Sequence, residues 1–210
     1  MWNLSQMRTR LGQRLAETST VFWGESEREG YINEAQRFVA SITKGVPQEV
    51  SGTVDSDTPY LPVSGKPLGE YPSAGVVDGR RVTFVPIEVA NAMDPHWGET
   101  VGSPRWLIFD PQFSRVYVSP KPYTAMTAEV AVSILPADLV NDSDELFGGA
   151  VAMEKYQGVV LNIAAALALL KERYDGDAER FYAFAVNELQ SLGFRPAEIP
   201  PLREEPNVDA

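Results

Sequence analysis

The sequence lacks cysteine and holds a single histidine among its 210 residues. Without cysteine the chain has no disulfides, thiolate metal ligands or cysteine nucleophiles, which fits a reducing compartment. One histidine, His96, cannot supply a histidine-rich metal site. Neither the GxGxxG nor the GxxxxGK[ST] phosphate-binding pattern occurs, and the acidic run at Asp142–Glu145 does not match a calcium loop. We therefore expect no metal and no cofactor.

Basic residues are scarce, because 18 Lys and Arg stand against 29 Asp and Glu, a formal net charge of -11. Proteins that wrap nucleic acid neutralise its phosphates with basic patches, so this function is not expected. An acidic surface is compatible with DNA sliding past the protein, since like charges prevent sticking. Solubility alone explains the same charge balance.

Long hydrophobic runs are also lacking. In the longest apolar segment, residues 147–174, the uncharged run is bounded by Lys155 and Lys171. It therefore falls short of the ~20 residues that cross a bilayer. The N-terminal residues are interrupted by arginines and show no signal-peptide pattern. We expect cytosolic synthesis and no membrane partner.

Apolar residues spaced three and four apart predict four helices. The first carries an apolar stripe from Leu4 to Leu15, and the second begins at a Ser26–Glu29 capping box. Residues 147–174 form the third, which is apolar nearly all round and should be a buried central helix. The fourth, over residues 178–192, should pair with it as an antiparallel hairpin.

Between the second and third helices, prolines, glycines and short β-rich runs replace the helical periodicity. Asp110-Pro111 predicts a turn, so residues 106–118 should form a β-hairpin. Pro86 suits the start of a short helix over residues 87–93. The candidate strands are residues 52–54, 60–63, 82–85, 106–109, 115–118 and 128–135.

These elements predict an α+β fold that is mainly α. It comprises a four-helix bundle, a β-rich insertion between helices two and three, and an extended C-terminal tail. The expected domains are residues 1–46 with 140–192 (bundle), 47–139 (insertion) and 193–210 (C-terminal arm). The arm is rich in proline and carries Phe194, Ile199 and Leu202, apolar anchors that a partner's groove could bury.

Chemistry-bearing residues are sparse. His96 lies in Asp94-Pro95-His96-Trp97, where a turn residue beside a packed tryptophan is a better interpretation than a catalytic group. We expect no catalytic residue, and an acid-dependent hydrolase is the weakest alternative. The aromatic residues of the insertion more often fill a core or a subunit interface than a ligand platform. A glycan-binding module remains an alternative.

Five segments together resemble a known family. They are INEAQRFVA (32–40), PIEVANAMDPHW (86–97), WLIFDPQFSRVYVSPKP (106–122), EVAVSILPADL (129–139) and the turn at residues 174–177. Through these segments and the order of its elements, most of residues 1–192 resembles the head–tail adaptors (connector or head-completion proteins) of tailed bacteriophages.

The resemblance implies a structural virion protein, not an enzyme. It implies a homo-oligomeric ring, usually a dodecamer, that is mounted below the portal protein, extends the DNA channel and docks the next tail or connector protein. The bundle would form the ring body, and DNA would pass without specific binding. The protein would reside in the virion, and in the host cytoplasm during assembly. Another tail or baseplate ring subunit is the alternative within this class.

The resemblance also suggests two sets of contact residues. We expect the arm to bind the portal, and the insertion to contact the next tail component or a neighbouring subunit. The expected portal-binding residues are Phe194, Arg195, Ile199, Leu202 and Arg203; the second set is Trp97, Trp106, Phe113, Tyr117 and Tyr123.

Overall fold

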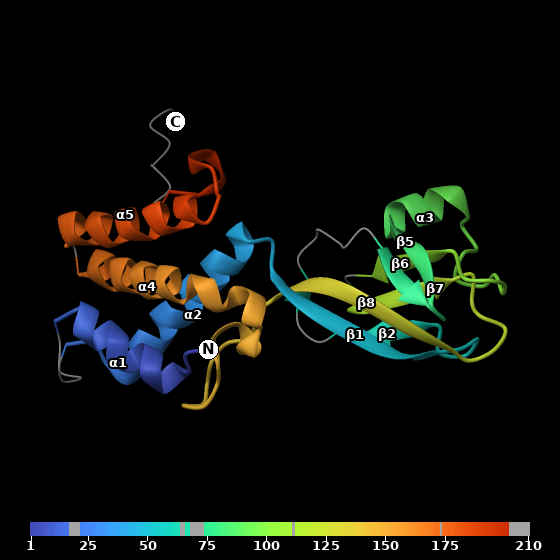
Figure 1. Cartoon of the computed structure of the whole chain (residues 1–210), viewed down its shortest axis with the longest axis horizontal. Coiled ribbons are helices and arrows are strands. Elements are labelled where there is room, and N and C mark those ends of the chain that lie inside the picture. Colours follow the sequence, from blue (N-terminus) through green and yellow to red (C-terminus); the bar gives the residue numbers. More distant parts are fainter. Residues whose placement is uncertain (17–21, 64–65, 68–73, 111, 173, 202–210) are drawn as a thin grey trace. The chain divides into compact units, whose positions relative to one another are not determined.

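A computed structural model of the chain describes residues 1–16, 22–63, 66–67, 74–110, 112–172 and 174–201. The chain divides into two compact units (Figure 1). The helical unit comprises Met1–Thr43 and Ala137–Ala210, and the sheet unit comprises Lys44–Pro136. The chain thus leaves the helical unit after Thr43 and returns to it at Ala137.

The helical unit is organised around one buried helix. Its α-helices are α1 (Leu4–Arg14), α2 (Glu25–Ile42), α4 (Gln157–Lys171) and α5 (Asp175–Ser191). Helix α4 packs against the other three, with α5 on one side and α1 and α2 on the other (Figure 1). Its alanines at 164, 165, 166 and 168 are fully buried. The prediction of a central helix apolar on all faces therefore holds for residues 157–171.

Local capping sets the starts of the first two helices. Asn3 accepts a hydrogen bond from the Gln6 amide at 2.9 Å, and the Gln6 side chain accepts one from the Asn3 amide at 3.2 Å. This capping box starts α1 at Leu4. The predicted Ser26–Glu29 box is wrong, because α2 already begins at Glu25. There the Glu27 carboxylate accepts from the Gly24 amide at 3.1 Å.

The predicted continuous helix over residues 147–174 is interrupted at its start. Phe147, Gly148 and Gly149 have φ values of 54°, 62° and 77°. A left-handed backbone cannot continue a right-handed α-helix. The chain instead forms two 3₁₀ turns, Leu146–Gly149 and Val151–Tyr156, before α4 begins. The spacing of apolar residues did not reveal this break, because Phe147 is itself buried.

Two buried amides of α2 hold the segment that returns from the sheet unit. The Asn33 side chain accepts from the Leu139 amide at 2.8 Å and donates to the Leu139 carbonyl at 3.1 Å. Gln36 donates to the Ala137 carbonyl at 3.0 Å and accepts from the Phe147 amide at 2.7 Å. The two side chains therefore satisfy the backbone of buried Leu139 and the amide of buried Phe147, and Gln36 also ties down the Ala137 carbonyl.

A half-buried acid lies between α4 and α5. A Cβ atom at Gly158 would lie 2.6 Å from Glu188 Oε1, so this glycine leaves room for the carboxylate. Burial raises the pKa of Glu188, and the positive charge of Arg14 partly opposes the shift. The native state therefore favours the protonated acid more than the unfolded state does.

Replacing Glu188 by glutamine should stabilise the protein at neutral pH. The pKa of Glu188 is higher in the folded state than in the unfolded state. The protonated acid therefore favours folding below the unfolded-state pKa, and this stability is lost as the pH rises through the folded-state pKa. Glutamine stays neutral and avoids the loss. The variant should melt about 1 °C higher than the parent at pH 7.5, a small shift because solvent screens this carboxylate. The difference should vanish near pH 4.5.

Melting curves at the two pH values, with Glu179→Gln as the matched exposed substitution on the same helix, test this expectation. An equal shift for Glu188→Gln at both pH values would contradict the titration argument.

The described residues of the sheet unit form a mixed sheet and a short helix. Its elements are β1 (Val46–Val54), β2 (Tyr60–Pro62), β3 (Lys66–Pro67), β4 (Ala74–Val77), β5 (Arg80–Pro86), α3 (Ile87–Met93), β6 (Trp106–Asp110), β7 (Arg115–Ser119) and β8 (Met126–Leu135). The strand order is β1-β8-β4-β5-β6-β7-β2, and β3 also pairs with β8. The β5–β6 pairing is parallel and the other pairings are antiparallel.

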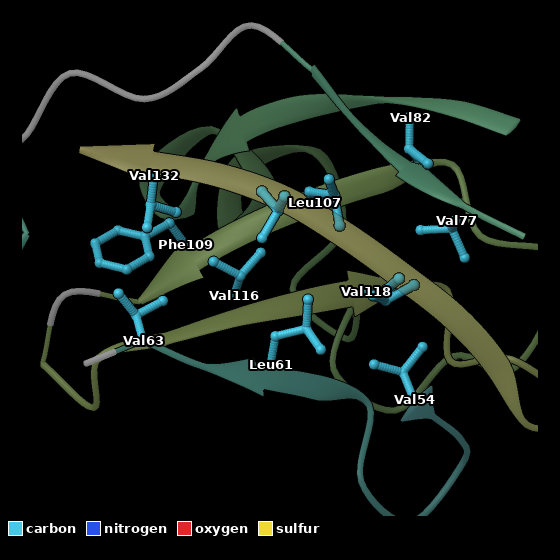
Figure 2. Packing of buried hydrophobic residues seen from close by; sticks show 12 residues of the cluster. Val54, Leu61, Val63, Val77, Val82, Leu107, Phe109, Val116, Val118 and Val132 are labelled. Atoms are coloured by element: carbon cyan, nitrogen blue, oxygen red, sulfur yellow. The ribbon is translucent and has the colours of Figure 1, made fainter. Parts of the chain in front are cut away.

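The sheet curls until its two edges approach each other. A Cβ atom on Gly52 of β1 would lie 3.0 Å from Leu61 Cδ2 of β2, although these strands stand at opposite ends of the strand order. The sheet is therefore nearly closed and barrel-like. Its inward side chains, among them Leu61, Leu107 and Phe109, form a separate hydrophobic core (Figure 2).

The fold class predicted from the sequence is wrong. A mainly α four-helix bundle was expected, whereas the described residues contain five α-helices and a large barrel-like sheet with its own core. The longest strand pairing joins β1 to β8, which are the first and the last strand of the sheet unit in the sequence. Such non-local pairing leaves no periodic signal in a local window of sequence, so the strands looked like a minor insertion.

Two local predictions for the sheet unit are confirmed. β6 and β7 form an antiparallel hairpin, with Trp106 opposite Ser119 and Asp110 opposite Arg115. Pro86 precedes the short helix α3, which has the predicted bounds. Of the predicted Asp110-Pro111 turn, Pro111 lies outside the described residues, whereas Asp110 Oδ1 accepts from the Gln112 amide at 2.9 Å.

Candidate functional site

An aromatic groove lies on the outer face of the sheet unit. Val116 and Val118 of β7 point into the core, so Tyr117 between them points outward. A groove of about 390 Å³ is formed here by Pro59, Tyr60, Trp97, Asp110, Tyr117 and Lys121, among others. The aromatic groove thus combines three aromatic rings with one acid and one base.

Strand pairing and edge contacts position the three rings. Tyr60 of β2 stands directly opposite Tyr117 of β7, with ring centroids 5.5 Å apart. Trp97, in the loop after α3, meets Tyr117 edge-on with centroids also 5.5 Å apart. The Trp97 indole N–H donates to Asn91 Oδ1 of α3 at 2.8 Å. The ring orientation is therefore fixed by the protein itself.

The Arg115 guanidinium lies beside two aromatic rings, those of Tyr60 and Phe113. Its guanidinium carbon lies 4.1 Å from the Tyr60 ring centroid and 5.8 Å from that of Phe113. A hydrogen bond to Tyr117 raises the pKa of Arg115. The Tyr60 ring therefore already stacks with a cation, which is the contact that an electron-rich ring face favours.

The structure brings together only part of the predicted aromatic set. Trp97 and Tyr117 meet in the aromatic groove, and Phe113 joins them through Arg115. Trp106 starts β6 and is half-buried, whereas Tyr123 is 73% exposed in the loop before β8. Four residues at or beside the groove were not predicted from the sequence as site residues: Tyr60, Asp110, Arg115 and Lys121. Asp110 and Arg115 face each other in the predicted β6–β7 hairpin, whereas Tyr60 reaches the groove through the β2–β7 pairing, which no local motif signals.

The first part of the predicted arm packs on its own helical unit. Phe194 lies edge-on to Tyr156 with ring centroids 6.2 Å apart, and Ile199 is buried. The Tyr182 hydroxyl donates to the Pro200 carbonyl. Arg195 is exposed, and Leu202 and Arg203 lie outside the described residues. Phe194 therefore anchors the root of the arm to the 3₁₀ turn Val151–Tyr156, and the Tyr182–Pro200 hydrogen bond ties it to α5.

The charged groups near the N-terminus are used within the chain. Arg8 pairs with Glu29 at 3.0 Å, with Glu25 at 3.4 Å and with Asp142. Arg8 of α1 therefore makes contacts within the chain. His96 is exposed, and its Nδ1 lies 3.6 Å from Glu99 Oε2.

No group of three or more His, Asp or Glu side chains among the described residues could hold a metal ion. Within the same residues, no helix is long and apolar enough to span a membrane. The described residues of the sheet unit form the aromatic groove.

Comparison with known protein families assigns the chain to one of them. The model of the SU10 adaptor protein family matches residues 2–204. The chain therefore belongs to the SU10 adaptor protein family, a family of phage head–tail adaptors. No curated protein matches the sequence.

This membership confirms the family that the sequence resembles. The protein is a component of the phage particle that interacts with other head or tail proteins. An adaptor is a structural component, and the family suggests a non-enzymatic role.

Proposed function

We propose that the protein forms a ring below the portal, extends the DNA channel and docks the next tail component. The observation that carries this proposal is the family match over residues 2–204. The formal charge of -11 supports a channel role, because an acidic wall repels the phosphates of passing DNA. Assembly would take place in the host cytoplasm before the particle is complete.

The ring contact is proposed to use exposed apolar side chains of the helical unit, not the alanines of α4. Those alanines are fully buried within the chain. Val140, Val151 and Phe184 are 74%, 81% and 46% exposed. Heterologous contacts between unlike surfaces of identical copies close a ring when the rotation between copies permits it.

Electron microscopy of the purified protein, alone and with the portal protein of the same phage, tests the ring. Closed rings, stacked on the portal in the mixture, are the expected result. A species that remains monomeric in the mixture would contradict the proposal.

The arm, residues 193–210, is proposed to dock on the portal. Phe194 and Ile199 fix its root on the helical unit, and Arg195 is exposed beside that root. Leu202 and Arg203 are proposed to make the apolar and polar contacts to the portal further along the arm. The sheet unit is proposed to contact the next tail component or a neighbouring copy through its aromatic residues Trp97, Trp106, Phe113, Tyr117 and Tyr123.

Truncation after Pro201 should abolish portal attachment and leave the fold intact. The cut lies after the hydrogen bond between the Tyr182 hydroxyl and the Pro200 carbonyl, so this contact of the arm is kept. Co-sedimentation with portal and a melting curve measure the two effects. The matched control replaces residues 202–210 by a Gly/Ser segment of equal length. Portal attachment by both altered proteins would contradict the role of the arm.

A further inference from the structure

Helices α1 and α5 of the helical unit carry opposite charges. α1 has three arginines and no acid, which gives it a net charge of +3. α5 has four acids and one arginine, which gives it a net charge of -3. The two helices flank α4 on different sides (Figure 1). The helical unit therefore has a basic helix on one of its surfaces and an acidic helix on another.

The exposed face of α1 is hydrophilic and presents a fixed cation. A groove of about 340 Å³ on this helix is lined by polar side chains, namely Ser5, Gln6, Thr9, Arg10 and Gln13. The Arg10 guanidinium carbon lies 4.2 Å from the centroid of the Trp2 ring. Such stacking holds the guanidinium while its N–H groups remain available to a carboxylate.

Arg10 is the arginine that α1 offers to a partner. Arg8 already pairs with Glu25 and Glu29 of its own chain. Within the part of the chain that the structure describes, no carboxylate forms an ion pair with Arg10. Arg10 is also exposed, so an acid of another molecule can reach it.

The exposed face of α5 combines an acid with an apolar side chain. Asp177 and Phe184 are seven residues apart, which is two helical turns, so they lie on the same face. Both are exposed, and so is the small side chain of Ala183 beside them. Arg180 Nη1 lies 3.8 Å from Asp177 Oδ1, and such an exposed pair contributes little. Asp177 is therefore available to a stronger cationic partner.

The spacing on α5 matches that on α1. Arg10 follows the N-cap Asn3 by seven residues, again two turns. In an antiparallel pair of these helices, Asp177 opposite Arg10 therefore brings Phe184 to the start of α1. The loop that carries exposed Val140 is bound there, because the Leu4 amide donates to the Asp144 carbonyl at 2.9 Å. One packing thus makes an ion pair and an apolar contact together.

We infer that α1 of one copy of the chain binds α5 of a second copy, with Arg10 paired to Asp177 and Phe184 packed beside Val140. The two surfaces differ, so the contact is heterologous and can repeat from copy to copy until a ring closes. The inference rests on the proposed ring, and it adds which two helices join the copies.

Cysteine cross-linking of the full chain tests this contact. The chain has no cysteine, so Ser5→Cys and Ala183→Cys introduce its only thiols. With a short bismaleimide, the chain that carries both substitutions should give a ladder of covalent trimers and larger species. Each single variant should remain mostly monomeric, and an equimolar mixture of the two should stop at dimers, because each copy then has one reactive surface.

Charge reversal tests the ion pair in the same assay. Adding Arg10→Glu to the doubly substituted chain should lower the yield of trimers and larger species about fivefold or more, because the pair becomes repulsive. Adding Asp177→Arg as well should restore the ladder, since the pair is attractive again in the reverse order. This rescue also shows that Arg10→Glu leaves the chain folded.

Glu34→Cys is the matched control for Ala183→Cys, because Glu34 is exposed on α2 of the same unit. Combined with Ser5→Cys it should give no ladder. Three outcomes would overturn the inference: no ladder from Ser5→Cys with Ala183→Cys, an equal ladder from the control, or a ladder that Arg10→Glu leaves unchanged.

Electron microscopy of the uncross-linked protein separates this inference from the proposed function. Closed rings without a ladder would leave the ring proposal standing and overturn the α1–α5 contact. A ladder from a protein that never closes into rings, alone or with the portal, would support the contact and overturn the ring proposal.

Discussion

Replacing Gln36 by leucine is expected to lower the free energy of unfolding by about 1–3 kcal/mol, because the buried Phe147 amide loses its acceptor and the Ala137 carbonyl loses its donor. The Gln36 side chain is fully buried and bridges the Ala137 carbonyl at 3.0 Å and the Phe147 amide at 2.7 Å. Leucine fills a similar volume but offers neither a donor nor an acceptor. The left-handed turn at Phe147 would then keep an unsatisfied N–H inside the helical unit.

Urea denaturation followed by circular dichroism measures the loss. Gln190→Leu is the matched control, since it makes the same change at an exposed position of α5. It should change the free energy of unfolding by less than about 0.5 kcal/mol. A Gln36→Leu variant as stable as the Gln190→Leu variant would show that the bridge contributes little.

Replacing Gly75 by alanine is expected to destabilise the sheet unit by about 3 kcal/mol through overpacking. A Cβ atom there would lie 2.6 Å from Leu107 Cδ1 and 2.8 Å from the carbonyl oxygen of Glu129. The second contact is with backbone of β8, which pairs with β4 at this point, so the strands themselves must shift.

Hydrogen exchange of the intact chain measures this effect locally. The β4 and β8 amides should lose protection in Gly75→Ala, while the α4 amides keep theirs. Gly98→Ala is the matched control, because nothing lies within 4 Å of its added Cβ atom. Unchanged protection in β8 of the Gly75→Ala variant would contradict the close approach of these strands.

Several local features of the fold could be predicted from the sequence. The predicted α1 stripe, the α3 bounds after Pro86 and the β6–β7 hairpin depend on neighbours within a few residues. The family resemblance was also readable, because it rests on segments spread over most of the chain. These features are encoded locally, and local order in the sequence predicted them.

The aromatic groove could not be predicted from the sequence. Trp97 and Tyr117 stand out as aromatic residues, but Tyr60 joins them only because β2 pairs with β7. The arm anchors Phe194 and Ile199 look available to a partner in the sequence, yet they pack within the helical unit. Burial by a distant element leaves no signature in the residues that it covers.

By itself the sequence determined the helical segments, the absence of cysteine chemistry, the acidic charge and the phage adaptor family. Each of these depends on residue identity or on contacts within a helical turn. Only the tertiary structure decided that the insertion is a barrel-like unit with its own core, and which residues line the aromatic groove. The physical reason is that strand pairing between distant segments is selected by how their side chains pack together, and not by any periodicity within one segment.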